Sequence, residues 1–227
     1  MQEVASLDAL LERADVLVSV CPPSAALEVA RSVAEAGFDG IYVDVNAISP
    51  MSSQAIAQRF THFVDGGVIG PPASAAGTTR LYLSGDSADE VAALWNGSVV
   101  ETRLVEGGAG AASAVKICYA AWTKGTAALL LATRALASVA GVEHSLLDEW
   151  ATSIPGLAAQ SQAAAAGNAP KAWRFVGEME EIASTFAAFG LPDGFATAAA
   201  EVYRRMAGFK NATDTSIADV IEAMIQS

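Results

Sequence analysis

The sequence is short of cysteine, of aromatic residues and of basic charge, and these shortages exclude several classes of protein. Its 227 residues include two cysteines, Cys21 and Cys118, which lie in apolar runs and have no CxxC spacing. We therefore expect neither a disulfide framework nor a zinc site, and reduced cysteines favour a cytoplasmic protein. Thirteen basic against 25 acidic residues give a net charge of −12, which argues against nucleic acid or an anionic membrane as the main partner.

The sequence also lacks a run that is long and apolar enough to span a bilayer. The most apolar stretch, residues 125–133, is too short, and Lys116, Lys124 and Arg134 interrupt the longer window around it. Alanine, in contrast, is abundant in a chain that is 52% hydrophobic. This composition is typical of closely packed helices around a small sheet.

The first half of the chain alternates apolar runs with helical segments. Residues 16–20 and 41–45 are predicted to be buried strands, and HFVDGGVIG, LYLSG and VVETRLV supply three more. Ser6, Ser24 and Ser49 are expected to cap helices, and Gly37 to end one. Strands that alternate with helices predict parallel βαβ units with helices on the sheet faces.

Three loops that follow strands are candidates for a binding site: residues 21–24 (CPPS), 46–50 (NAISP) and 67–74 (GVIGPPAS). In an open parallel sheet the ligand crevice lies outside the carboxyl ends of the strands, so all three should line one edge. Each loop alone is explained equally well as a turn, since Pro, Gly and Asn are turn residues. Three in succession favour a site.

From about residue 106 to the end the pattern is helical, beginning with a long segment over residues 107–141. We therefore predict two domains, 1–106 and 107–227, packed closely with a crevice between them. A sheet of this kind suggests a dinucleotide-binding fold, yet no G-x-G-x-x-G turn follows the first strand. If the fold is of this type, the sequence begins partway through it, and the residue that would choose between NAD and NADP is absent.

Lys116 is the most conspicuous polar residue of the long helical segment. Burial disfavours the charged form of a lysine, which suits a general acid or base. The alternative is a lysine that lays its stem on apolar surface and sends its amine to solvent. Ser113 and Tyr119 flank it and could hydrogen-bond a substrate oxygen. Glu178 and Glu181 share a helical face, which is usually a solvated one.

Four segments, in this order, also carry a resemblance to a known family: ADVLVSVCPP, YVDVNAISP, FVDGGVIGPPASAAGTTRLYLSGD and GAASAVKICYAAWTKG. They resemble the β-hydroxyacid dehydrogenases, which include 3-hydroxyisobutyrate and 6-phosphogluconate dehydrogenases. The likeness is closest to a phosphogluconate-dehydrogenase-like branch with a distinctive C-terminal domain. The first two segments resemble cofactor-contacting strands, the third a substrate-binding segment, and the fourth the catalytic G-x-G-x-x-x-K-x-x-x-N segment, with Lys116 on its lysine.

The resemblance implies a partial Rossmann-like parallel sheet (residues 1–106), without its N-terminal part, followed by an all-α 6-phosphogluconate-dehydrogenase-like domain (residues 107–227). It implies a homodimeric oxidoreductase that uses NADP or NAD, with Lys116 as general acid/base on a small hydroxy or oxo compound. The implied cofactor contacts are Cys21, Pro22, Pro23, Asn46 and Ser49. The implied substrate contacts are Gly67, Val68, Gly70, Ser113, Tyr119, Glu178 and Glu181.

The sequence departs from the family pattern at positions that hold substrate in relatives. Ile69 replaces a serine, Pro71 and Ala112 replace glycines, and Ala120 replaces the asparagine one turn after the lysine. Glu178 and its acidic neighbours stand where relatives carry a Lys-Asp pair. These changes imply a less anionic substrate, or a carbonyl or imine held differently. A catalytically inactive dimeric remnant or scaffold and an imine reductase are the alternatives, and no metal-binding constellation is visible.

Overall fold

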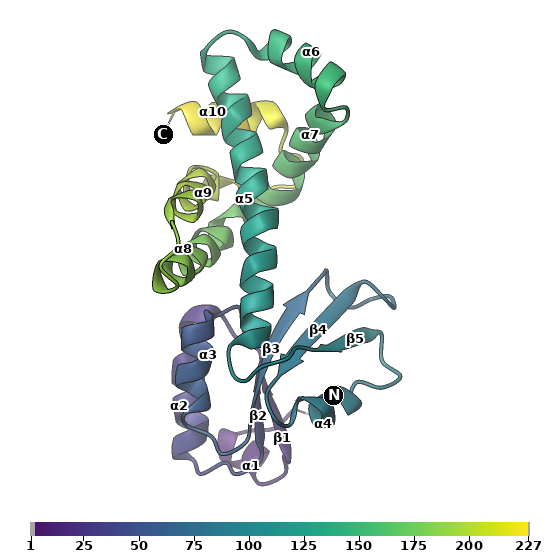
Figure 1. Ribbon diagram of the computed structural model, residues 1–227, viewed down its shortest axis with the longest axis vertical. Helices are drawn as coiled ribbons and strands as arrows, with labels where there is room; N and C mark the ends of the chain where they lie inside the picture. The colour runs from purple at the N-terminus through teal and green to yellow at the C-terminus, as the bar shows by residue number, and fades with distance from the viewer. Residues whose placement is uncertain (1–2, 227) are drawn as a thin grey trace. The chain divides into compact units, whose positions relative to one another are not determined.

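The computed structural model describes residues 3–226. The chain divides into two compact units, Met1–Cys118 and Tyr119–Ser227. The boundary falls inside the long helix α5 (Ala111–Val139), so that the first turns of α5 belong to the first unit and the rest to the second. The two units are described separately below, and their elements are labelled in Figure 1.

The first unit is built on a five-stranded sheet whose strands lie in chain order. The strands are β1 (Val16–Ser19), β2 (Ile41–Asp44), β3 (Phe63–Ile69), β4 (Thr79–Ser84) and β5 (Val100–Leu104). The sheet is mostly parallel, which confirms the fold class, and only the β3–β4 pair is antiparallel. That exception follows from the connection, residues 70–78, which is shorter than the dozen or so residues of a parallel crossover.

Helices cover both faces of this sheet (Figure 1). On one face, α2 (Ala26–Glu35) and α3 (Pro50–Ala57) pack with Leu17 and Tyr42 in one apolar cluster. On the other face, α4 (Ala88–Ala93) packs over Ile41, Val43 and their neighbours in β3 and β4. Helices on both faces bury β2 along its whole length, as predicted, although Asp44 interrupts its apolar run. The prediction that residues 16–20 are buried is wrong at Val18 and Val20, which are 40% and 78% exposed, because β1 is an edge strand.

The local capping predictions are confirmed at three of four positions. Ser6 accepts a hydrogen bond from Ala9 N at the start of α1 (Leu7–Leu11), and Ser49 caps α3 ahead of Pro50. Gly37 follows α2 with φ 78°, a conformation that favours glycine. The prediction for Ser24 is wrong: it lies within a 3₁₀ turn, η1 (Pro23–Ala25), and α2 begins after Ala25 without a side-chain cap.

In the second unit, every regular element within the described residues is helical. After α5 come α6 (Glu143–Ser153), α7 (Leu157–Asn168), η2 (Ala169–Lys171), α8 (Ala172–Ala188), α9 (Gly194–Arg205), η3 (Ala207–Phe209) and α10 (Ile217–Gln226). The α8–α9 pair forms the core, where Tyr203 is fully buried and its ring meets that of Phe175 edge-on at 5.3 Å. This confirms the expected all-helical second half.

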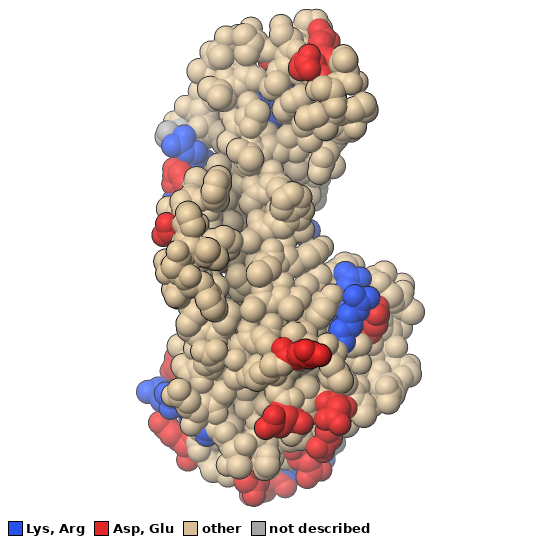
Figure 2. All heavy atoms as spheres, in the orientation of Figure 1, with Lys and Arg blue, Asp and Glu red and all other residues tan. Residues whose placement is uncertain are grey.

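The surface reflects the acidic composition of the chain. Figure 2 shows Asp and Glu side chains gathered over the part of the first unit that carries α1 and α4. Between residues 3 and 226, none of the helices is long and apolar enough to cross a membrane.

Candidate functional site

The carboxyl ends of β1 and β2 are tied together by one asparagine. Asn46 donates from Nδ2 to Ser19 Oγ at 3.0 Å and to Asp44 Oδ2 at 2.9 Å, and its Oδ1 accepts the backbone N–H of Cys21 at 2.6 Å. Its own backbone N–H donates to Asp44 Oδ1 at 2.9 Å. The loops after β1 and β2 therefore lie together at one edge of the sheet, as predicted, and the hydrogen bonds of Asn46 fix the conformation of both loops.

The first turn of α5 is fastened to the sheet by a buried carboxylate. Asp65, in β3, accepts hydrogen bonds from Ser53 Oγ at 2.8 Å, Ser113 Oγ at 2.6 Å and Ser113 N at 2.8 Å. Ser84, in β4, accepts the N–H of Ala112 at 3.1 Å. A negative charge at a helix N-terminus is favourable because unpaired N–H groups and the helix dipole face it. Two strands therefore hold the start of α5 in place.

Lys116 lies one turn beyond this fastening, half-buried against the sheet. A Cβ placed on Gly67 would stand 3.2 Å from Lys116 Cβ and 2.9 Å from the carbonyl oxygen of Ala112. Only glycine at position 67 lets α5 come this near to β3. Two of the predicted site residues, Gly67 and Lys116, thus lie next to each other.

A second buried carboxylate shares this region. Asp44 ends β2 and is 1% exposed. Burial raises the pKa of Asp44 to about 6, the hydrogen bonds from Asn46 oppose this rise, Asp65 adds to it and Lys116 opposes it. Since charges act over short distances at a buried site, Asp44, Asp65 and Lys116 form one electrostatic group. Such a group at the end of a sheet is typical of an active site.

The remaining predicted site residues of the first unit differ in how far they are exposed to a ligand from solvent. Pro22, Pro23 and Gly70 are exposed, whereas Cys21 and Val68 are half-buried. Asn46 and Ser49 are buried, and Ser49 accepts the N–H of Ser52 as the cap of α3. Ser113 is 1% exposed and its hydroxyl is bound to Asp65, so this geometry gives it an anchoring task. Its predicted substrate contact gains no support.

The described residues could form only part of a binding site for a dinucleotide cofactor. The loops after β1 and β2 lie where an open parallel sheet binds its ligand, and Pro22 and Pro23 reach the surface there. They cannot bind a pyrophosphate, because proline has no N–H to donate. The glycine turn at residues 107–110 leads into α5, where Asp65 already takes the N–H of Ser113 and would repel a phosphate. Among the described residues, these loops therefore provide no pyrophosphate-binding turn.

The predicted residues of the second unit lie around another lysine. Lys124, in α5, forms an ion pair with Glu178 of α8 and lies 4.9 Å from the ring centroid of Phe175. Tyr203 donates its hydroxyl to the carbonyl oxygen of Lys124 at 2.9 Å. Glu178 is therefore engaged in holding α8 against α5. Glu181 is half-buried in the same helix, and Tyr119 is 49% exposed on α5.

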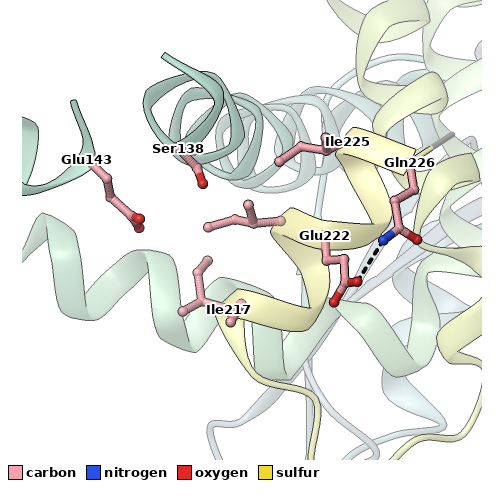
Figure 3. A pocket seen from close by; sticks show the side chains of 8 residues that line it. Ser138, Glu143, Ile217, Glu222, Ile225 and Gln226 are labelled. Carbon is pink, nitrogen blue, oxygen red and sulfur yellow. Dashed lines mark hydrogen bonds between the residues drawn. The ribbon is translucent and has the colours of Figure 1, made fainter. Parts of the chain in front are cut away.

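The second unit also contains a hollow of about 330 Å³ between the end of α5, the start of α6 and α10 (Figure 3). Its wall is apolar along α10, and Glu222 accepts a hydrogen bond from Gln226 at 2.6 Å. It is lined by Ser138, Glu143, Ile217, Ala218, Ile221, Glu222, Ile225 and Gln226. None of the predicted site residues is among them, so this hollow is separate from the candidate site.

Sequence reasoning missed the two buried aspartates. Asp44 and Asp65 each stand inside or at the end of an apolar strand, in YVDV and FVDGG. A carboxylate in such a run is costly to bury unless it is bonded. That cost is a signal which could have marked both residues before the structure, whereas Ser53 and Ser84 carry no comparable signal.

Comparison with known proteins gives matches of three kinds. A family model described as a domain of unknown function, DUF1932, matches residues 137–206. An uncharacterized 28.5 kDa protein of Methanothermus fervidus is 30% identical over 141 residues, which are 61% of this chain and 54% of that protein. The chain thus spans about half the length of this curated relative.

Two solved structures are at least 25% identical in sequence to this chain. One is a conserved protein of unknown function reported as structurally similar to 3-hydroxyacid dehydrogenases: 25% identity, TM-score 0.70, covering 90% of this chain and 79% of that one. The other is a conserved hypothetical protein from Sinorhizobium meliloti 1021: 27% identity, TM-score 0.71, covering 96% and 77%.

Two further structures share the fold at lower identity. A Mycobacterium tuberculosis 3-hydroxyisobutyrate dehydrogenase with L-serine is 19% identical, with a TM-score of 0.70 over 97% of this chain and 83% of that one. Psf3 in complex with NADP+ and 2-OPP is 18% identical, with a TM-score of 0.58 over 97% and 84%. The chain therefore has an NAD(P) oxidoreductase-like fold. In fold, the chain is similar to the β-hydroxyacid dehydrogenases.

Proposed function

We propose that the chain takes part in nicotinamide-dependent oxidation or reduction of a small hydroxy or oxo compound, with Lys116 as the general acid/base. The observation that carries the proposal is the placement of Lys116. It is half-buried, packed on Gly67, and electrostatically coupled to Asp44 at the end of the sheet. A lysine in such surroundings can take up and release a proton during turnover.

A bound nicotinamide ring would supply or accept the hydride. Lys116 would do the complementary proton work: in oxidation its neutral amine takes the proton of the substrate hydroxyl, and in reduction its ammonium returns a proton to the carbonyl oxygen. Asp65 would keep the start of α5, and with it Lys116, at a fixed distance from β3. The loops at Cys21–Pro23 and Asn46–Ser49 would border the nicotinamide.

The substrate class rests on the relatives and on the departures from them. A fold neighbour is a 3-hydroxyisobutyrate dehydrogenase, which supports a hydroxy acid or its oxo form. Ile69, which stands where the family has serine, is 5% exposed and has no polar group to offer an anion. We therefore propose a substrate with less negative charge than a phosphorylated sugar acid. NADP is supported by the fold neighbour that binds NADP+.

Binding of reduced cofactor is the first test. NADPH and NADH are titrated separately into the chain, and binding is followed by the change in nicotinamide fluorescence and by calorimetry. We expect saturable binding of one of the two, and a weaker complex in Asn46→Ala because the loops after β1 and β2 lose their tie. No binding of either cofactor would contradict the proposal and favour a catalytically inactive scaffold.

A further inference from the structure

The edge of the sheet that carries the candidate site also carries an arginine, Arg80. β4 runs antiparallel to β3, so its first residues lie beside the carboxyl end of β3, where Ile69 and Arg80 are opposite each other. The carboxyl ends of β1 and β2 lie at the same edge, because both strands run parallel to β3. Arg80 therefore lies at the edge where an open sheet of this kind binds its ligand.

Arg80 also lies on the same face of the sheet as Lys116. A Cβ on Gly67 would stand 3.2 Å from Lys116 Cβ, and Ile69, two residues further along β3, is on the same face as Gly67. Arg80 shares this face, because it is the cross-strand partner of Ile69. Gly67 and Arg80 are thus separated by roughly 8 Å between Cα atoms. Both Lys116 and Arg80 have long side chains, so both can reach one small molecule.

The position of Arg80 compensates for a polar group that this chain lacks. Ile69 stands where the family has a substrate-binding serine, and its apolar side chain is 5% exposed. Side chains directly opposite each other in an antiparallel pair are about 5 Å apart at their Cβ atoms. The guanidinium of Arg80 is therefore carried by the neighbour, across the sheet, of the position that has lost its hydroxyl.

Among residues 3–226, no carboxylate pairs with Arg80. A guanidinium has five N–H donors, and the hydrogen bond that Arg80 forms there, from Nη1 to Gly77 O, is long at 3.3 Å. Glu101, its neighbour in β5, is paired instead with Arg103 at 2.8 Å. Figure 2 shows basic side chains gathered over the part of the first unit that carries β4 and β5. On a chain with a net charge of −12, Arg80 is thus an uncompensated cation at the edge of the site.

The buried carboxylate that holds α5 is remote from Arg80. Asp65 is opposite Ser84, which is four residues further along β4. This separation is roughly 13 Å along the strands. An anion that would be repelled at the start of α5 can therefore bind at Arg80.

The loop that precedes Arg80 is held by its own side chains. Thr79 donates its hydroxyl to the carbonyl oxygen of Pro71 at 2.6 Å, and Thr78 donates to that of Ala75 at 2.7 Å. Together with the bond from Arg80, these contacts fix the loop before a ligand arrives. A site that is ordered in advance loses less conformational entropy on binding.

We propose that Arg80 binds the carboxylate group of the substrate, while Lys116 acts on the hydroxyl or oxo group of the same molecule. Two parallel N–H donors of a guanidinium match the two oxygens of a carboxylate. A single uncompensated cation suits a monocarboxylate better than a phosphorylated acid. The inference rests on the reaction proposed above, and it places the anion site on β4 instead of at the serine position of β3.

NMR titration of the chain tests this site without any turnover. 3-Hydroxypropionate and its neutral analogue 3-hydroxypropionamide are added separately to nitrogen-15-labelled protein, with and without NADPH. We expect saturable amide shifts around Arg80 and Lys116 with the acid, and at least ~10-fold weaker binding of the amide, which lacks the charge. In Arg80→Gln the dissociation constant of the acid should rise by ~10–100-fold. In Arg80→Lys it should rise less, because the charge remains.

Arg59→Gln is the matched control, since Arg59 is exposed between α3 and β3 in the same unit and its loss changes the net charge equally. It should bind the acid as wild type does, and urea denaturation verifies that all variants fold. No saturable binding of the acid by wild type, or equal affinity of wild type and Arg80→Gln for it, overturns the proposal. Equal affinity of wild type for acid and amide, or tighter binding of inorganic phosphate, overturns it as well. Binding of the acid that depends on Arg80 without turnover would support this site and contradict the function proposed for Lys116.

Discussion

Ser113 binds Asp65 twice, through its hydroxyl at 2.6 Å and its backbone N–H at 2.8 Å, and each of these bonds goes to a different carboxylate oxygen. The two residues are 48 positions apart in the chain. These two hydrogen bonds fix both the position and the rotation of the first turn of α5. It is the reason why Lys116, one turn later, has a defined place beside β3.

Asp65→Asn should therefore destabilise the chain. An amide offers one acceptor in place of two and turns an N–H₂ group toward donors, so at least one buried donor loses its partner. We expect a loss of about 2–4 kcal/mol in the free energy of unfolding, measured by urea denaturation. Asp39→Asn, at an exposed position, serves as the control and should lie within ~0.5 kcal/mol of wild type. Equal stability of the two variants would contradict the anchoring role.

Gly67→Ala should push α5 away from the sheet. The added Cβ would meet the Ala112 carbonyl oxygen at 2.9 Å and Lys116 Cβ at 3.2 Å, and neither atom is the end of a flexible side chain. We expect a cost of about 1–3 kcal/mol and a fall in any turnover, because Lys116 shifts. Gly177→Ala in α8 has open space around the new methyl group and should be neutral or slightly stabilising. Wild-type stability and turnover in Gly67→Ala would show that the close approach is unimportant.

Asp44 should make stability depend on pH in an unusual direction. Burial raises the pKa of Asp44 from 3.8 to about 6, so the folded chain binds more protons than the unfolded chain between these values. The contribution of Asp44 to the free energy of unfolding therefore decreases as pH rises through this window, by about 3 kcal/mol at most. Below this pH window Asp44 is protonated in both states and its burial does not reduce the free energy of unfolding. Above the window Asp44 is ionised in both states, and the free energy of unfolding is reduced by the full amount.

The difference in stability between wild type and Asp44→Asn isolates this effect from other carboxyl groups. It should change by about 2–3 kcal/mol between pH 4 and pH 7, wild type being relatively more stable at the acidic end. The carbon-13 shift of the Asp44 carboxyl group should also titrate near pH 6. A difference that stays constant over this range would contradict the raised pKa.

Local features of the fold could be read from the sequence, because they depend on neighbouring residues. Ser49 before Pro50 predicts the start of α3, and Gly37 predicts the end of α2. Ser24 failed as a cap because Pro23 begins a 3₁₀ turn that includes it. The reversed direction of β4 was readable in principle, since the connection after β3 has no room for a crossover helix.

The candidate site could be predicted only in outline. Motif spacing selected Lys116 and Gly67, and the structure brings them together. Motif spacing could not select Asp65. Its hydrogen-bond partners Ser53 and Ser113 come from distant segments, and such bonds depend on tertiary packing. For the same reason a sequence pattern does not distinguish a serine that binds substrate from one that anchors a helix.

The proposed chemistry depends on one amine, so the most direct measurement is turnover of Lys116→Ala. Wild type, Lys116→Ala and the exposed-lysine control Lys171→Ala are assayed with the bound nicotinamide cofactor against small 3-hydroxy acids, their oxo forms and cyclic imines. We expect a loss of ~10²–10⁴-fold in Lys116→Ala, with its urea midpoint nearly unchanged, partial rescue by added primary amines, and full activity in Lys171→Ala. Turnover of Lys116→Ala within about threefold of wild type would contradict the role of Lys116 as the acid/base.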